Sequence, residues 1–160
     1  MCEYCGCQDV EAIKQLTDEH DQIVEMMGAV RAADRRDDLP AMIALSAQLV
    51  AALRPHSRIE EEGLFPAMAD VFPDHVAALE AEHRVIESVF AAAGDGRAAA
   101  DPTWRHRVPA TLELLREHIL KEQDGLFPAA LATLTSDEWD TLDALRRTVE
   151  SLDVRVASDG

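Results

Sequence analysis

The amino-acid sequence predicts an all-α protein: an antiparallel up-and-down four-helix bundle with an additional C-terminal helix. The chain has 160 residues, which is enough for one domain. Hydrophobic residues make up 48% of the chain but aromatic residues only 4%, so Ala and Leu carry most of the apolar content. The apolar residues recur at alternating steps of three and four, which places them along one face of a helix.

Four breaks, at residues 34–38, 72–74, 94–102 and 134–137, divide the chain into five helical stretches joined by short links. Two helix starts carry local signals. Asp101-Pro102 is typical of an N-cap followed by proline at the first helical position, and Thr135 to Glu138 form a capping-box pattern. We therefore expect a Cys-containing N-terminal segment at 1–8, the bundle at 9–134, and a C-terminal helix and tail at 135–160.

Each of the first four stretches interrupts its apolar stripe with a histidine. The first series is Ile13, Leu16, His20, Ile23, Met27 and Val30. The second is Met42, Leu45, Leu49, Leu53, His56, Glu60 and Leu64, and the third is Val76, Leu79, His83, Ile86 and Phe90. In the fourth, Leu112 and Leu115 lead to His118 and Glu122. The fifth stretch carries an apolar face of Trp139, Leu142, Leu145, Val149 and Leu152, expected to pack on the bundle or, alternatively, to form a homodimer or dock on a partner.

The acidic balance of the chain excludes several classes of partner. The chain has 15 Lys and Arg against 31 Asp and Glu, which gives a net charge of −16. Phosphate backbones and anionic lipid surfaces repel such a chain, so we expect no nucleic acid and no membrane as partners. No apolar run approaches the ~18–20 residues that span a bilayer, and the N-terminus lacks the features of a signal peptide. A cytoplasmic location is therefore expected.

An internal duplication is the strongest signal in the sequence. The segment from His56 to Ala67 matches the segment from His118 to Ala129 at an offset of 62, with the histidine, the glutamate four residues later and Gly-Leu-Phe-Pro-Ala identical. At an offset of 63, a second match pairs residues of the first and third stretches: Leu16, Glu19, His20 and Ile23 match Leu79, Glu82, His83 and Ile86. The sequence therefore predicts two helix hairpins of the same design.

The paired histidines and glutamates predict a metal site. Residues four apart project from one helix face, so His56 and Glu60 point inward together, as do His118 and Glu122. Burial of such groups is costly unless they are paired or bind a cation. Mixed imidazole and carboxylate ligands suit iron, manganese or zinc, and the excess over one tetrahedral zinc site indicates two metals that share bridging carboxylates. A lone histidine on an apolar stripe is more often a core residue, but four of them, one per helix, favour the metal site.

The order of these residues resembles the bacterial hemerythrin-like proteins, the hemerythrin HHE cation-binding domain family. The resemblance covers about residues 10–134 and rests on His20, the two His-x3-Glu pairs, His83 and the Gly-Leu-Phe-Pro that follows each pair. It implies a four-helix bundle around a non-haem di-iron centre, in which the histidines are terminal ligands. It also implies that Glu60 and Glu122 are bridging carboxylates beside an oxo or hydroxo bridge.

The third and fourth stretches depart from the oxygen-carrying hemerythrins, which have His-x3-His and His-x4-Asp where this chain has His83-x3-Glu87 and His118-x3-Glu122. Glu87 either fills the missing position as a seventh metal ligand, leaves it open to water or an exogenous ligand, or is a solvated glutamate. The ligand chemistry favours a protein that binds or reacts with O2, peroxide (H2O2) or nitric oxide. The alternative is an iron-, oxygen- or redox-responsive sensor or iron-storage module without turnover, and the sequence leaves enzymatic activity open.

Three features lie outside this pattern. The cluster Cys2, Cys5 and Cys7 is expected either to bind an additional metal or to act as redox-active thiols with a redox partner, unless that terminus is disordered. His75 and His106 fall outside the apolar series and are expected at the surface. The polar residues that follow the two ligand glutamates are expected to be solvated, with orientation of a ligand histidine by one of them as the alternative. They are Glu61, Glu62, Gln123 and Asp124.

Overall fold

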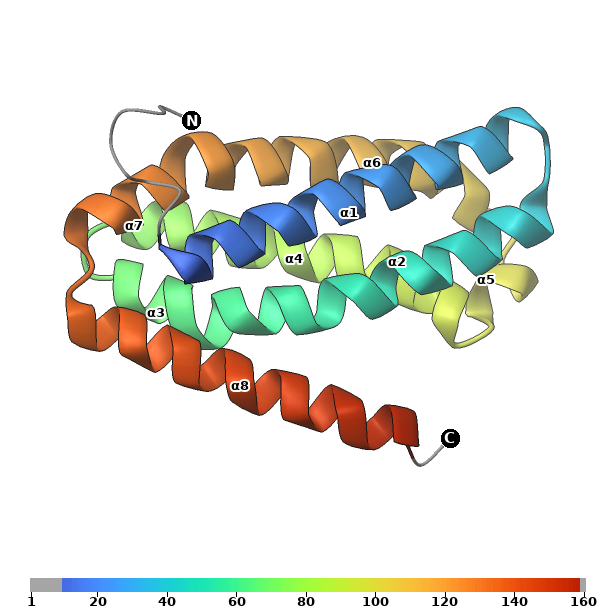
Figure 1. Cartoon of the computed structure of the whole chain (residues 1–160). Coiled ribbons are helices and arrows are strands. Elements are labelled where there is room, and N and C mark those ends of the chain that lie inside the picture. The colour runs from blue at the N-terminus through green and yellow to red at the C-terminus, as the bar shows by residue number, and fades with distance from the viewer. Residues whose placement is uncertain (1–9, 159–160) are drawn as a thin grey trace.

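The computed structural model describes residues 10–158, and every regular element in that range is helical. Cys2, Cys5 and Cys7 lie outside the described residues. The main helices are α1 (Glu11–Arg35), α2 (Leu39–Ile59), α4 (Pro73–Gly94), α6 (Trp104–Lys121) and α8 (Ser136–Ser158). The first four lie side by side with alternating chain direction, and each packs against two neighbours (Figure 1). The predicted all-α four-helix bundle with an additional C-terminal helix is confirmed.

Helices α2 and α6 each continue through one wide turn. The π-helical segment η1 (Glu60–Leu64) joins α2 to α3 (Phe65–Met68), and η2 (Glu122–Leu126) joins α6 to α7 (Phe127–Thr133). A proline follows each segment, Pro66 and Pro128, and its ring crowds the carbonyl of the preceding turn while offering no N–H. Such π-turns are frequent at functional sites. The duplicated Gly-Leu-Phe-Pro therefore corresponds to a duplicated distortion of the helix.

The helix starts follow the predicted signals with one correction. Thr135 and Glu138 form the predicted capping box: the Thr135 N–H donates to Glu138 Oε2 (2.8 Å), and the Glu138 N–H to Thr135 Oγ1 (3.4 Å). Asp101 accepts from the Thr103 N–H (2.8 Å), but α6 begins only at Trp104, and the short helix α5 (Arg97–Ala100) precedes it. Pro102 at the first helical position was therefore a wrong prediction, because residues 101–104 form a tight turn.

The buried apolar residues form two clusters, one at each end of the bundle. Phe90 and Trp104 belong to one cluster, whereas Phe65 and Phe127 belong to the other. On α1 the boundary falls at His20, since Leu16 belongs to one cluster and Ile23 to the other. The bundle thus encloses a polar layer between two apolar layers. Within the described residues, no helix carries an apolar stretch long enough to cross a membrane.

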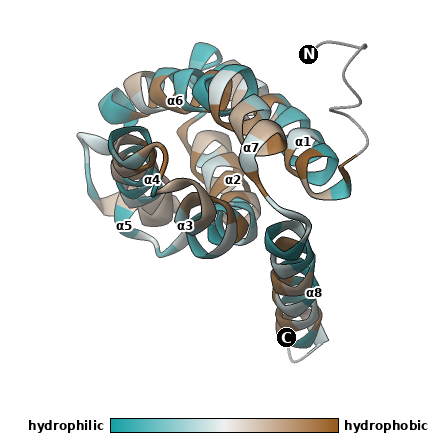
Figure 2. Ribbon diagram, turned by 90° about the vertical axis from the view of Figure 1, so that its left-hand side faces the viewer, coloured by the Kyte–Doolittle hydropathy of each residue, from teal (hydrophilic) through white to brown (hydrophobic). Residues whose placement is uncertain are grey.

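Helix α8 lies outside the ring of four and packs against α2, η1 and α1 (Figure 2). Its Leu142 and Val149 are buried, but the end of the predicted apolar face is not, and Leu152 is 39% exposed. The helix rests on Gly63 of η1, where an added Cβ would lie 3.0 Å from Leu145 and 3.1 Å from Leu142. The absence of a side chain at Gly63 therefore lets α8 approach the turn that carries Glu60.

Candidate metal centre

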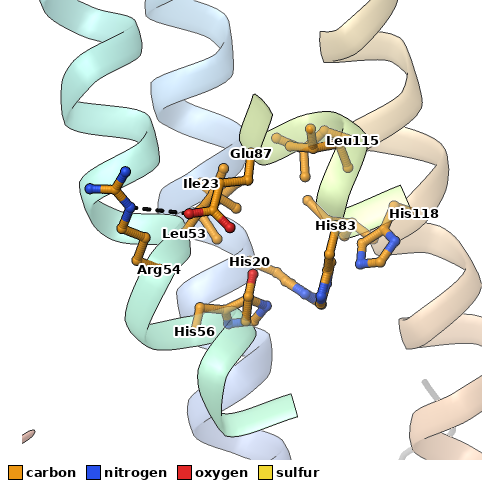
Figure 3. Close-up of a pocket in the computed structure, with 12 residues that line it drawn as sticks. His20, Ile23, Leu53, Arg54, His56, His83, Glu87, Leu115 and His118 are labelled. Carbon is orange, nitrogen blue, oxygen red and sulfur yellow. Dashed lines mark hydrogen bonds and ion pairs between the residues drawn. The ribbon is translucent and has the colours of Figure 1, made fainter. Parts of the chain in front are cut away.

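Six of the seven predicted ligand residues come together in the polar layer. Each helix of the bundle supplies one histidine, and the four histidines converge on a common point (Figure 3). The first residue of each π-helical segment supplies a glutamate. All six side chains are 7% exposed or less, and they are His20, His56, Glu60, His83, His118 and Glu122.

These side chains form two groups of four donors. His20 and His56 form one group with both glutamates, and His83 and His118 form the other with the same glutamates. Within each group, one donor atom from every residue lies within 4.8 Å of the others. Because Glu60 and Glu122 belong to both groups, the arrangement has the composition of two adjoining cation positions with two shared carboxylates.

Each shared carboxylate offers one oxygen to each group. Oε1 of Glu60 lies 3.2 Å from Nε2 of His56, and Oε2 lies 3.3 Å from Nε2 of His83. Oε1 of Glu122 lies 2.9 Å from Nε2 of His118, and Oε2 lies 3.1 Å from Nε2 of His20. The duplication predicted from sequence therefore appears as a near-symmetric arrangement, in which each glutamate has one oxygen beside a histidine of its own half and one beside a histidine of the other half.

Six donor atoms of this centre are buried without a hydrogen-bond partner in the structure. Both oxygens of Glu60 and of Glu122, together with Nε2 of His20 and of His118, are fully buried without a hydrogen bond. Buried polar groups in proteins are otherwise nearly always satisfied. The short distances between histidine nitrogens and glutamate oxygens therefore do not have hydrogen-bond geometry. The atoms point instead at common positions that lie between them. Imidazole nitrogens and carboxylate oxygens that converge in this way fit a pair of divalent transition-metal ions.

Electrostatics tie the histidines to the shared carboxylates. Burial is the largest single influence on the pKa of His56 and lowers it, but the contacts with Glu60, Glu19 and Glu122 together outweigh burial and raise that pKa to about 10. In the same way, burial opposes the charge of Glu122 at His118, whose pKa rises to about 9. Burial alone would raise the pKa of Glu60, yet the adjacent His56 holds it well below the usual range. The buried negative charge of the two glutamates is thus balanced either by protons on the histidines or by bound metal ions.

A second set of carboxylates holds three of the four histidines from outside. Nδ1 of His56 donates to Glu19 (2.8 Å), Nδ1 of His83 to Glu61 (2.8 Å) and Nδ1 of His118 to Glu82 (2.9 Å). Such bonds fix the ring orientation and leave Nε2 free to bind a metal. The residues that follow the ligand glutamates were expected to be solvated, but Glu61 takes the alternative role of orienting a ligand histidine.

Glu19 and Glu82 were not predicted, although the sequence contained a signal for them. Both precede a stripe histidine and match each other in the duplication. Each, however, serves a histidine of a neighbouring helix, so only the packing of the helices reveals the pairing. Burial alone would raise the pKa of Glu19 and of Glu82, but their hydrogen bonds to the histidines and to nearby cations hold both values below the usual range.

The phenylalanines of the duplicated motif pack on the histidine rings of α1 and α4. Phe127 stacks on His20 and Phe65 stacks on His83, each with ring centroids 5.5 Å apart. Each ring thus comes from the other half of the duplication. The motif therefore both distorts the helix after the glutamate and fixes a histidine opposite it.

A small cavity of about 20 Å³ adjoins the four histidines. This volume slightly exceeds the ~10–15 Å³ that one water needs. Its walls are otherwise mainly apolar, and its outer end lies beside Arg54 and Glu87 (Figure 3). The apolar wall residues are Ile23, Leu53, Ile86, Leu115 and Ile119. The cavity suits an uncharged molecule of very few atoms.

Glu87 is the one predicted ligand that the structure does not bring to the centre. Its carboxylate pairs with Arg54 at 3.2 Å, and its side chain is 55% exposed. It lines the outer part of the cavity, whereas the donor groups lie at the inner end (Figure 3). His106 is exposed and His75 partly buried, and both lie outside the two donor groups.

Replacement of Glu87 by glutamine is therefore expected to leave the metal content unchanged. The exposed pair with Arg54 contributes less than ~1 kcal/mol, so the fold is also expected to be unaffected. The measurement is the number of metal ions per chain by elemental analysis, beside the wild-type protein purified in parallel. A clear loss of metal would return Glu87 to the ligand set.

Comparison with known proteins gives one match. A sequence model of the hemerythrin HHE cation binding domain matches residues 11–130. Curated proteins and solved structures give no match. The matched range contains all six buried groups of the centre and ends before α8 begins.

Proposed function

The chain belongs to the hemerythrin HHE cation-binding domain family, and on that premise we propose that its bundle holds two non-haem iron ions that bind or react with O2, peroxide or nitric oxide. The observation that carries the proposal is the sharing of Glu60 and Glu122 between two groups of buried donors. His20 and His56 would hold one ion, His83 and His118 would hold the other, and Glu60 and Glu122 would contribute to both positions. Glu87 is left out of this ligand set.

Iron at this centre would supply ligand binding and electron transfer, and the protein supplies the surroundings. The outer carboxylates Glu19, Glu61 and Glu82 orient three ligand rings through Nδ1. The apolar walls of the cavity disfavour charged and bulky molecules, because a polar group there would lose its hydration without a hydrogen bond in return. The size and lining of the cavity therefore support small, uncharged ligands.

Metal analysis together with an absorption spectrum tests this proposal. We expect about two irons per chain and an oxo-to-iron charge-transfer band that changes on addition of hydrogen peroxide. One zinc per chain and a featureless spectrum would contradict the proposal. Peroxide consumption over many turnovers would identify an enzyme, whereas a single stoichiometric reaction would identify a sensor or store.

Iron binding at pH 7 is expected to release about two protons per chain, since imidazole must be neutral to bind a metal. The pKa values of His56 and His118 are raised to about 10 and 9, so both rings are protonated in protein stripped of metal by a chelator. Affinity should consequently increase as pH rises from 6 to 9. Calorimetric titration with anaerobic Fe(II), in buffers of different ionisation enthalpy, counts the protons. Binding without proton release would show that both rings are already neutral before the metal binds or that they do not bind it.

A further inference from the structure

The two histidine pairs of the centre are anchored in different ways at their outer side. Glu82, which accepts from His118, also accepts from Lys121 on the same helix as that histidine. Glu19, which accepts from His56, also accepts from Arg146 of α8. One pair is thus anchored entirely within the bundle, whereas the other depends on the additional helix.

The duplication explains why α8 must supply a cation. Ile59 stands at the position that corresponds to Lys121, and it is buried in the core. Arg146 therefore takes the place of a lysine that the first half lacks. The side chain of Arg146 is only 10% exposed, against 43% for Lys121. Arg146 is the more buried partner of this ion pair, and its loss leaves the partly buried carboxylate of Glu19 without this cation.

The pair of His20 and His56 also has less support from the bundle itself. Glu61 accepts from His83, but Gln123 stands at the corresponding position of the other half. Nδ1 of His20 is buried without a hydrogen-bond partner among the described residues. Only His56 in this pair has a carboxylate behind it, and that carboxylate is held by α8.

We propose that α8 controls occupancy of the metal position formed by His20 and His56, with Arg146 as the positioning residue. When α8 is docked, Arg146 holds the carboxylate of Glu19, and Glu19 in turn holds the ring of His56 through Nδ1. The metal position is then complete. Coupling between two sites is reciprocal, so metal at this position also holds α8 against the bundle. The inference rests on the proposed two-metal function.

The first test compares Arg146→Met with Arg147→Met, which makes the same charge change at an exposed neighbouring residue of α8. Metal-free protein is titrated anaerobically with Fe(II), and the two binding steps are followed. In the Arg146 variant we expect one step to remain as in wild type and the other to weaken about 10-fold. This is the lower end of the effect of losing a direct partner of a ligand histidine, because Arg146 acts through Glu19. Arg147→Met should bind like wild type, and Arg146→Lys should recover most of the lost affinity.

The second test moves α8 without changing any charge. Gly63→Val should push Leu142 and Leu145 away, whereas the matched Gly125→Val meets only His75 at 4.0 Å and does not face α8. We expect Gly63→Val to weaken the same single binding step and Gly125→Val to leave it intact. In wild type, amide hydrogen exchange in residues 139–150 should slow on Fe(II) loading, and in Arg146→Met this slowing should disappear.

Two outcomes would overturn the inference. In Arg146→Met, both binding steps keep the wild-type affinity for Fe(II), or both lose affinity to the same extent. Equal weakening would mean that Arg146 supports the fold as a whole and not one metal position. Wild-type protein that binds fewer than two irons would instead refute the proposed function, so the two failures are distinguishable.

Discussion

Glu122→Gln is expected to lower the iron content from about two ions per chain to well below one, because Glu122 belongs to both groups of donors. Glutamine keeps the shape of the side chain but removes the charge that balances bound cations. In the wild type, Oε2 of Glu122 faces His20 and Oε1 faces His118. The substitution therefore removes the carboxylate charge from both metal positions. Elemental analysis and the charge-transfer band measure the effect, and the surface variant Glu87→Gln is the matched control.

His118→Ala should have a smaller effect than Glu122→Gln. His118 belongs to one group only, so this variant is expected to retain about one ion per chain. His106→Ala, at an exposed position, should retain two. Equal iron content in Glu122→Gln, His118→Ala and His106→Ala would contradict the ligand assignment.

The sequence was sufficient to predict the fold and the convergence of the centre because both depend on local periodicity. Apolar steps of three and four predicted the helices, and the spacing of His56 to Glu60 predicted that both side chains share a face. The duplication then related the halves. None of this required knowledge of which helices are neighbours.

The outer contacts could not be predicted in the same way, since they join residues of different helices. Glu19 serves His56 from 37 residues away, and Arg146 reaches Glu19 from 127 residues away. The π-turns were also missed, because a helix pattern read at 3.6 residues per turn does not distinguish a turn widened by one residue. Spacing also could not decide between the alternatives for Glu87: its distance along the helix from His83 fits a ligand, but Arg54 of α2 pairs with its carboxylate at the surface.

Removal of both irons with a chelator is expected to lower the melting temperature by about 10–20 °C. Free iron at a hundred times the dissociation constant stabilises each site by ~2.7 kcal/mol, and 1 kcal/mol corresponds to ~2–4 °C for a chain of this size. The structural reason is that six donor atoms of the centre are buried without hydrogen bonds. Thermal unfolding followed by circular dichroism, with and without iron, gives the shift. Glu122→Gln is the control, and its melting temperature should not respond to iron.

The difference in melting temperature between iron-loaded and metal-free protein should increase as pH rises from 6.5 to 9. In metal-free protein, His56 and His118 titrate at about 10 and 9, above their ordinary value near 6.5. A histidine whose pKa is raised by folding contributes stability that is complete below about 6.5 and is lost as pH passes through the raised value. Metal-free protein therefore loses stability over this range, whereas iron binding gains from the absence of competing protons. Melting curves at pH 6.5, 7.5 and 8.5, at a fixed concentration of free Fe(II), measure the difference between the two forms. A constant or narrowing difference would show that protons and metal do not compete for these rings.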